Sequence, residues 1–433
     1  MSGHIGIFSK ENINVAPLLH WSLYALQHRG EVGSGMAVFT GDDVKEIRGN
    51  GLVSDIYNED EINSIVGNKG AAHVKYAFQD ETTEDVLLPE VFNINDKKRI
   101  LSIDGNFLEK SLCRSDLMDM IISENITEHI NKLYGAYSII YMDEDKMVVI
   151  RDPWGIKNMV IGKYDNSFVV ASETAAIDSI GAEFIRDIAP GEIVIIDKEG
   201  LKSKFVENRY ERNCIFEFVY ISRQDSYING KSVYETRYNL GRKLAEESPV
   251  NADVVIDAPD SGTIAALGYS HESGIQYKEG ILKNRYVGRT FILPDQKMRE
   301  KSVKIKMNPL KRNLDGKRVI LVDDSIVRGT TIKNTVKMLR DAGAIEIHVR
   351  IACPPVVKSC DLCVDTPSED NLIGANMTVE ETCKEIGADS LAYLSLDSLV
   401  NACGGNRYCK HCFDGNYPIE VKNGYNLQRC GCR

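Results

Sequence analysis

Apolar and polar residues follow two different rhythms along this 433-residue chain. Up to about residue 205, short apolar or alternating runs predominate, and such runs are typical of β-strands. Helical spacing of apolar residues over Ala16–Gln27 predicts one early helix. The predicted strands are His4–Phe8, Ser138–Tyr141, Met147–Ile150, Phe168–Ala171 and Glu192–Ile196. The first part of the chain is therefore predicted to be rich in β-sheet.

From Ser232 onward, predicted helices alternate with predicted strands. The helices are Val233–Glu247, Ala265–Ser270 and Thr331–Ala342, and the strands are Val254–Ile256, Val319–Val322 and Glu346–Ile351. This alternation favours a parallel, doubly wound α/β sheet. The stretch Cys403–Arg433 is rich in Gly, Asn and Cys, which predicts a loop-like tail that needs an external staple.

Composition excludes several classes of protein. The net charge of −11 and the lack of a basic run argue against a general nucleic-acid binder, so small molecules are the expected partners. No run reaches the roughly 18 apolar residues of a membrane span, and Met1-Ser2-Gly3-His4 lacks the build of a signal peptide, so we expect a cytoplasmic protein. Eleven cysteines are many for a reducing compartment, which favours metal or cluster ligation for some of them.

The segment Val319–Thr331 carries most of the chemical information. Its apolar residues predict a central strand, and Asp323 and Asp324 at the carboxyl end of that strand suit a ribose diol or a hydrated Mg²⁺. Ser325 and Gly329–Thr331 then offer hydroxyls and backbone N–H groups before a helix, which suits a 5′-phosphate. The alternative is that the two aspartates only cap the helix. The full string favours a site for a phosphorylated sugar.

Two further motifs fit the same chemistry. Pro259-Asp260-Ser261-Gly262 follows an earlier predicted strand and can wrap pyrophosphate with backbone amides, although such a sequence is often an ordinary turn. Lys283–Phe291 carries Arg285 and Arg289, which can grip phosphate oxygens in pairs, and it predicts a closing lid that Lys306–Pro309 would extend. A solvated basic loop is the alternative for this segment.

These strings, together with Phe216–Tyr220 and Gly387–Ser395, resemble the glutamine phosphoribosylpyrophosphate (PRPP) amidotransferases, which open purine synthesis. The resemblance covers nearly the whole chain. It implies an α+β N-terminal-nucleophile (glutaminase-like) sandwich domain over residues 1–210, an α/β type I phosphoribosyltransferase domain over 211–400, and a Cys-rich tail over 401–433. It also implies attack of ammonia on C1 of PRPP with loss of pyrophosphate, aided by Mg²⁺.

The resemblance also implies roles for individual residues. Arg285 and Arg289 would act in catalysis, and Ser261, Asp323 and Asp324 would hold Mg²⁺. The implied contacts to PRPP are Asp260, Ser261, Gly262, Asp323, Asp324, Ser325, Arg328, Gly329, Thr330 and Thr331. One branch of the family carries a [4Fe–4S] cluster, and the matching ligands are Cys214, Cys360, Cys409 and Cys412. Such a cluster would be structural, because nothing in the reaction moves electrons.

The cysteine pattern by itself leaves alternatives open. Cys409 and Cys412 form a C-x-x-C pair that suits zinc, a cluster or a redox dithiol. Cys363 makes a second C-x-x-C with Cys360 at a place where the family usually has glycine, so it is either a competing ligand or a core thiol. The same uncertainty applies to Cys430 and Cys432.

The glutaminase half departs from the family pattern. The family nucleophile is an N-terminal cysteine, and this chain has Ser2 at that position. Removal of Met1 would expose a serine with a free amine, so a serine N-terminal hydrolase is one alternative. However, Lys75 replaces the arginine that grips the glutamine carboxylate, and Asp104 replaces the asparagine that donates to the oxyanion. Lys157 replaces a further arginine. We expect a retained fold without ordinary glutaminase activity.

Three functions remain in competition. The first is an enzyme that makes phosphoribosylamine from PRPP and ammonia that is free or supplied by a partner. The second is a PRPP-dependent transferase with another nucleophile, and the third is a non-catalytic sensor of PRPP or purine nucleotides. The resemblance implies a homodimer or homotetramer with purine nucleotides as inhibitors.

Overall fold

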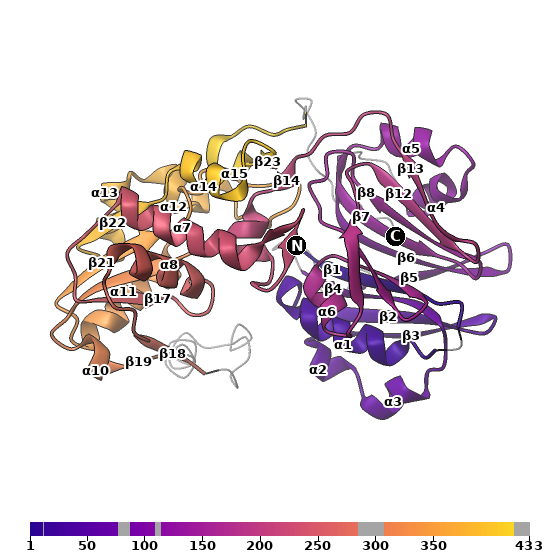
Figure 1. Ribbon diagram of the computed structural model, residues 1–433, viewed down its shortest axis with the longest axis horizontal. Helices are drawn as coiled ribbons and strands as arrows, with labels where there is room; N and C mark the ends of the chain where they lie inside the picture. The colour runs from indigo at the N-terminus through magenta and orange to yellow at the C-terminus, as the bar shows by residue number, and fades with distance from the viewer. Residues whose placement is uncertain (12, 77–86, 109–113, 285–306, 420–433) are drawn as a thin grey trace.

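The computed structural model describes residues 1–11, 13–76, 87–108, 114–284 and 307–419. Figure 1 shows two bodies next to each other along the long axis, a β-rich body from the N-terminal part and a layered α/β body from the C-terminal part. Among the described helices, none has the length and apolar character needed to cross a membrane.

The N-terminal body is built on two antiparallel sheets. The first has the strand order β11 (Glu183–Asp187), β9 (Val160–Tyr164), β10 (Ser167–Ala171), β1 (Gly3–Phe8), β4 (Lys69–Lys75), β2 (Gly33–Thr40) and β3 (Asp43–Asn50). The second has the order β13 (Gly200–Phe205), β12 (Glu192–Asp197), β8 (Lys146–Arg151), β7 (Gly135–Met142), β6 (Lys97–Phe107) and β5 (Glu90–Ile94).

Alternation along the strands explains how the two sheets pack. In β1, Ile5 and Ile7 join an apolar cluster with helix α1 (Ala16–Leu26), whereas Phe8 joins the cluster between the sheets. Successive strand residues point to opposite faces, so β1 is buried on both sides. Helix α6 (Thr174–Asp178) also lies on the first sheet, while α4 (Arg114–Ile122) and α5 (Ile126–Lys132) cover the second. The result is a four-layer sandwich; the short helices α2 (Val53–Ile56) and α3 (Glu59–Ser64) lie near α1.

The C-terminal body contains a parallel sheet of four strands among the described residues. Their order is β17 (Val254–Asp257), β20 (Arg318–Asp323), β21 (Glu346–Ile351) and β22 (Ser390–Tyr393). The longer helices are α7 (Val233–Glu247), α8 (Thr263–Ser273), α11 (Thr330–Asp341), α13 (Val379–Ile386) and α14 (Leu396–Cys403). Helix α8 packs on β17 and β20, and α11 packs on β21. Shorter elements are β15 (Tyr227–Ile228), β16 (Lys231–Ser232), β18 (Ile281–Lys283), β19 (Met307–Pro309), α10 (Lys311–Leu314) and α12 (Ile373–Asn376).

Two short elements join the bodies. A π-helical turn, η2 (Glu217–Ile221), opens the C-terminal body. Just before it, β14 (Asn213–Cys214) pairs in parallel with β23 (Tyr408–Cys409), so that Cys214 and Cys409 are register partners. A short helix, α15 (His411–Asp414), follows β23. The tail therefore returns to the junction between the two bodies.

Most of the predicted elements are confirmed, several to within two residues. Helix α7 and strand β21 have the predicted bounds, and α11 begins one residue earlier. The prediction of a loop-like tail is wrong up to residue 419, because β23 and α15 give that part hydrogen-bonded structure. Met307–Pro309, predicted to extend a lid, pairs with β18 as a hairpin strand.

Candidate functional site

The predicted PRPP residues meet at the carboxyl edge of the parallel sheet. Asp257 of β17 is the register partner of Val322 of β20, so the loop 258–262 lies next to Asp323. The Ser261 hydroxyl donates to Asp323 Oδ1 at 3.5 Å, and Asp324 is buried. In open α/β sheets, ligands bind outside the carboxyl ends of the strands. The two predicted motifs therefore share one site.

The surroundings of the two aspartates oppose the ionised form of both carboxyls. Burial raises the pKa of the Asp323 carboxyl, and the neighbouring Asp324 charge raises it further. Burial also raises the pKa of Asp324, although hydroxyls of Ser261 and Ser325 lower it in part. Two close carboxylates that resist ionisation gain free energy from a cation or from ribose hydroxyl donors.

The segment predicted to bind the 5′-phosphate directly precedes helix α11. Gly329 caps the helix with φ 77°, in the left-handed region that favours glycine, and an added Cβ would lie 2.7 Å from Ile373 Cδ1. Ser325 and Arg328 lie on the loop before it, and Thr330 and Thr331 open the helix. The free N–H groups of this twelve-residue helix favour an anion at its N-terminus.

The predicted lid arginines, Arg285 and Arg289, lie outside the described residues. Strand β18 leads toward that segment and ends at Lys283, whose ammonium donates to Asp260 Oδ2 at 2.5 Å. This ion pair joins the 258–262 loop to strand β18.

At the nucleophile position of the N-terminal body, Ser2 takes part in structural hydrogen bonds. Its hydroxyl accepts from the Tyr76 N–H at 3.1 Å, and its carbonyl accepts from Arg29 Nε at 3.1 Å. Lys75 ends β4, where its backbone faces Gly33 of β2, and an added Cβ on Gly30 would lie 2.4 Å from its carbonyl carbon. The backbone around Gly30 and Lys75 is closely packed.

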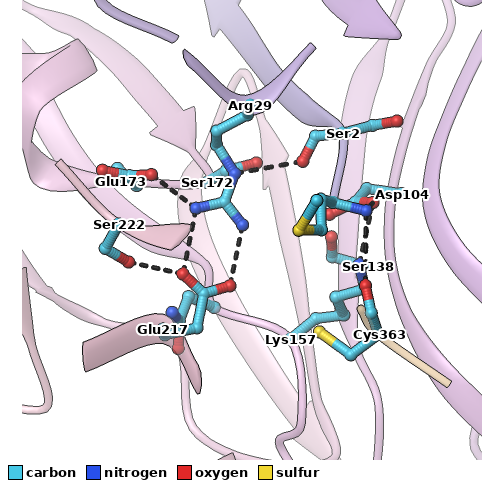
Figure 2. A network of polar contacts seen from close by, with 12 residues as sticks. Ser2, Arg29, Asp104, Ser138, Lys157, Ser172, Glu173, Glu217, Ser222 and Cys363 are labelled. Atoms are coloured by element: carbon cyan, nitrogen blue, oxygen red, sulfur yellow. Dashed lines mark hydrogen bonds and ion pairs between the residues drawn. The ribbon is translucent and has the colours of Figure 1, made fainter. Parts of the chain in front are cut away.

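Asp104 and Lys157 form a buried ion pair in the N-terminal body (Figure 2). Lys157 Nζ lies 2.9 Å from Asp104 Oδ1, and the side chains are 1% and 3% exposed. The amino group of Met1 lies 4.0 Å from the same carboxylate oxygen. Burial opposes ionisation of Asp104, but Lys157 and the Met1 amine hold the pKa of its carboxyl well below the ordinary range. An ionised carboxylate thus lies at the position where the resemblance predicts an oxyanion donor.

A second ionic network joins the two bodies. The Arg29 guanidinium donates to both Glu217 oxygens, at 3.1 and 2.8 Å, and also to Glu173. Glu173 accepts in addition from His28 at 2.8 Å and from the Ser226 hydroxyl at 2.7 Å. Figure 2 shows Arg29 between these carboxylates with Ser2 on its other side. The nucleophile position is therefore tied to the start of the C-terminal body.

Buried histidine and serine side chains of the N-terminal body form a neutral hydrogen-bonded network that the sequence did not suggest. His4 contacts the hydroxyls of Ser102 at 3.1 Å and Ser138 at 3.0 Å, and His73 contacts Ser102 at 3.0 Å. Burial lowers the pKa of His4 to about 4 and that of His73 to about 3. Polar residues in otherwise apolar strand patterns were the only signal for this network.

Two of the predicted cluster ligands, Cys214 and Cys409, lie at the junction of the bodies. Cys214 and Cys409 lie on paired strands, and the Cys360 sulfur accepts the N–H groups of Cys363 at 3.4 Å and Val364 at 3.5 Å. Such N–H donors stabilise a thiolate. Even so, no three His, Cys, Asp or Glu side chains in the described part of the chain are placed to hold a metal ion. The donor set suits iron and sulfide in kind, but its side chains do not converge.

Cys363 has neighbours that the sequence did not indicate. It is buried, and a hydrogen bond with its thiol raises the pKa of Cys214. Its carbonyl accepts from the Met1 amine at 3.4 Å, and Figure 2 shows its side chain near Lys157. The loop that carries Cys363 in the C-terminal body thus contacts the Met1 amine of the N-terminal body. Cys430 and Cys432 lie outside the described residues.

Comparison with known proteins agrees with this arrangement. A family model described as a glutamine amidotransferase domain matches residues 76–179. The amidophosphoribosyltransferase of Methanocaldococcus jannaschii is 40% identical, over 97% of this chain and 98% of its own, and that of Archaeoglobus fulgidus is 39% identical over the full length of both.

A solved structure gives the same result. The glutamine PRPP amidotransferase from B. subtilis, complexed with ADP and GMP, superposes with a TM-score of 0.90 and 38% identity, covering 98% of this chain and 99% of that one. Both the two-domain fold and the predicted resemblance are thereby confirmed. The chain belongs to the amidophosphoribosyltransferase family.

Proposed function

We propose that this protein transfers ammonia to C1 of PRPP, giving 5-phosphoribosylamine and pyrophosphate, and that its own glutaminase pocket does not supply the ammonia. The first part is supported by family membership and by the carboxyl edge of the parallel sheet, where Asp323, Asp324 and the 258–262 loop meet. We assign residues 1–210 to a glutaminase-like domain, 211–400 to the phosphoribosyltransferase domain and 401–433 to the tail.

Different residues at the carboxyl edge of the sheet would bind different parts of PRPP. Ser325, Arg328, Gly329, Thr330 and Thr331 hold the 5-phosphate, Asp323 and Asp324 hold the ribose hydroxyls, and Asp260, Ser261 and Gly262 hold the pyrophosphate. Mg²⁺, held with Ser261, Asp323 and Asp324, would neutralise the leaving pyrophosphate. Arg285 and Arg289 stabilise the same developing charge and exclude water.

The buried Asp104–Lys157 pair is the observation behind the silent glutaminase. Hydrolysis of glutamine develops an oxyanion, and one missing donor costs roughly a hundred- to a thousandfold in rate. Here an ionised carboxylate stands at the donor position, so the penalty includes repulsion as well. In addition, Ser2 Oγ is less acidic than a thiol, and its nitrogen is free to act as base only after Met1 is removed.

The test measures pyrophosphate release from PRPP and Mg²⁺ by anaerobically purified protein. One arm contains glutamine alone, and the other contains ammonium at raised pH. Turnover with ammonium alone is the expected result. Turnover with glutamine that disappears in Ser2→Ala would refute the silent pocket. No turnover in either arm would refute amination and favour another acceptor or a sensor of PRPP.

We further propose a structural [4Fe–4S] cluster on Cys214, Cys360, Cys409 and Cys412, a homodimer or homotetramer, and inhibition by purine nucleotides. The cluster is supported by the pairing of the strands that carry Cys214 and Cys409 and by the N–H donors to the Cys360 sulfur. The inhibition is supported by the ADP and GMP named with the B. subtilis enzyme. Iron and sulfide analysis of the parent protein and Cys409→Ser tests the cluster. Equal iron content in the two proteins would refute the ligand assignment.

A further inference from the structure

We propose that Asp257 is a positioning residue that sets the 258–262 loop in its pyrophosphate-binding conformation. The proposal rests on the proposed function, because it concerns affinity for the pyrophosphate group of PRPP. Asp257 ends β17 and is 4% exposed. It immediately precedes the loop and belongs to none of the motifs that identified the site.

Both oxygens of the Asp257 carboxylate accept a hydrogen bond from a side chain. Oδ2 accepts from the Thr263 hydroxyl, and Oδ1 accepts from the Tyr277 hydroxyl at 3.0 Å. Hydrogen bonds to a charged acceptor are stronger than those between neutral groups. The side chain is therefore held on two sides.

The two donors come from the elements that flank the loop. Thr263 is the first residue of α8, directly after Gly262. Tyr277 lies on a segment that runs along β17, where Val255 N–H donates to Gln276 at 3.1 Å and Lys278 N–H donates to Val255 at 2.9 Å. Asp257 thus fixes the strand before the loop, the helix after it, and the segment at the edge of the sheet.

The loop has little freedom once its ends are fixed. The Ala258 N–H donates to the Val322 carbonyl at 2.9 Å, and the Gly262 N–H donates to the Ala258 carbonyl at 3.0 Å. An added Cβ on Gly262 would lie 2.4 Å from the Val322 oxygen. Since Asp323 follows Val322, a shift at the start of α8 displaces the loop amides relative to the two aspartates. Affinity for pyrophosphate then falls without any loss of a direct contact.

A purely structural role makes a different prediction. In that case, loss of the Asp257 hydrogen bonds lowers stability and leaves PRPP affinity unchanged. The chain offers a matched control on helix α8. Tyr269 is buried, and its hydroxyl donates to the Ser248 carbonyl at 3.0 Å and not to Asp257. Tyr269→Phe removes one tyrosine hydroxyl from α8, just as Tyr277→Phe removes one from Asp257.

The experiment compares Asp257→Asn, Thr263→Val, Thr263→Ser, Tyr277→Phe and Tyr269→Phe with the parent. KM for PRPP and kcat are measured with saturating ammonium, and the Kd of Mg²⁺-pyrophosphate is measured by calorimetry. We expect about a tenfold rise in KM and Kd for Asp257→Asn and Thr263→Val, with kcat within about twofold. Tyr277→Phe should raise both severalfold, while Thr263→Ser and Tyr269→Phe stay near the parent values.

Unchanged KM and Kd in Tyr277→Phe and Thr263→Val would overturn the proposal, as would a fall in kcat with KM unchanged. An equal rise in KM and Kd in Tyr269→Phe would also overturn the proposal, because destabilisation of α8 as a whole would then be the cause. If Asp257→Asn does not fold, the Tyr277 and Thr263 variants still decide the question. A parent that binds Mg²⁺-pyrophosphate but does not turn over refutes the proposed amination, and the calorimetric series still tests Asp257.

Discussion

Exchanging Asp104 for asparagine restores the family's amide and leaves a buried lysine without its carboxylate. The Lys157 side chain is 1% exposed and its ammonium is 2.9 Å from Asp104. Burial alone would lower the pKa of Lys157, but Asp104 raises it above its ordinary value. Without Asp104, the lysine either stays charged in a poorly solvated place or loses its proton.

Loss of the proton sets an upper limit on the stability that Asp104→Asn loses through the stranded lysine. Deprotonating a lysine of pKa about 10.4 at pH 7 costs about 4.6 kcal/mol, at 1.36 kcal/mol per pKa unit. Protonating Asp104 in the complementary variant Lys157→Met costs about 4.2 kcal/mol from a pKa of about 3.9. Both values agree with the roughly 3–5 kcal/mol observed when one partner of a buried pair is removed. The double variant removes both charges of the pair, so we expect it to recover roughly 3 kcal/mol or more relative to the sum of the single variants.

Urea unfolding of the parent, Asp104→Asn, Lys157→Met and the double variant measures this cycle. The pH dependence of the two single variants should have opposite signs. The deficit of Asp104→Asn shrinks as pH rises, because the stranded lysine is then more easily neutral. The deficit of Lys157→Met shrinks as pH falls, because the stranded aspartate is then more easily protonated. Lys98→Met, which breaks an exposed pair with Asp43 in the same domain, serves as the control and should change stability little.

Additive single variants would refute this reasoning, because independent sites add to within about 0.5 kcal/mol. The same conclusion would follow if both single variants showed the same trend with pH. In either case, the close approach of the two side chains would not reflect a coupled buried pair.

Three further predictions follow from the described contacts. Asp323→Asn should raise the melting temperature of the ligand-free protein, since it relieves buried repulsion, and should lower pyrophosphate release with ammonium at least about a hundredfold; a lowered melting temperature would contradict the charge argument. Ser2→Ala should leave ammonium-dependent release unchanged within about twofold, because the Ser2 hydroxyl, which this change removes, accepts a hydrogen bond from the backbone N–H of Tyr76 and does not contact the predicted PRPP residues. The pKa of His4 is lowered to about 4 and that of His73 to about 3, so the unfolded chain binds more protons than the folded chain below pH 6.5. The free energy of unfolding should therefore decline by about 1.4 kcal/mol per pH unit for each histidine as the pH falls from 6.5 toward 4. A flat pH profile in urea unfolding would contradict the burial of the two histidines as neutral groups.

Sequence patterns predicted the strands and helices whose own apolar residues or capping residues show where they begin, end and are buried. Strand β20 is a run of apolar residues between polar ends, and its two aspartates lie at the sheet edge because parallel strands end there. Helix α7 begins at Ser232, whose hydroxyl accepts from Glu235 N–H at 3.2 Å, a start that the sequence already signals. Edge strands such as β3 and β13 were not predicted, because exposed polar residues fill much of them.

Contacts between distant segments could not be predicted in the same way. The family pattern identified Asp104 and Lys157 as two separate changes, but nothing in either local sequence says that they meet. The predicted early helix ends at Gln27 and implies no partner for Arg29, whereas in the structure Arg29 bridges Glu173 and Glu217 across the domain junction. Asp257 lies one residue beyond the predicted strand Val254–Ile256, and its two partners lie on a following helix and on a segment beyond that helix. Such contacts depend on how the elements pack, and spacing along the chain carries no information about it.

The pairing of β14 with β23 has a consequence for the order of folding. Arg29, Glu173, Glu217 and Ser226 can complete the first interdomain network as soon as the opening turns of the C-terminal body have been synthesised. By contrast, Cys214 must wait for Cys409, near the end of the described chain. Contacts of such wide sequence separation form late, since the loop between them must first be closed. A nascent chain would therefore settle its N-terminal sandwich early and bring the thiols of the junction together last.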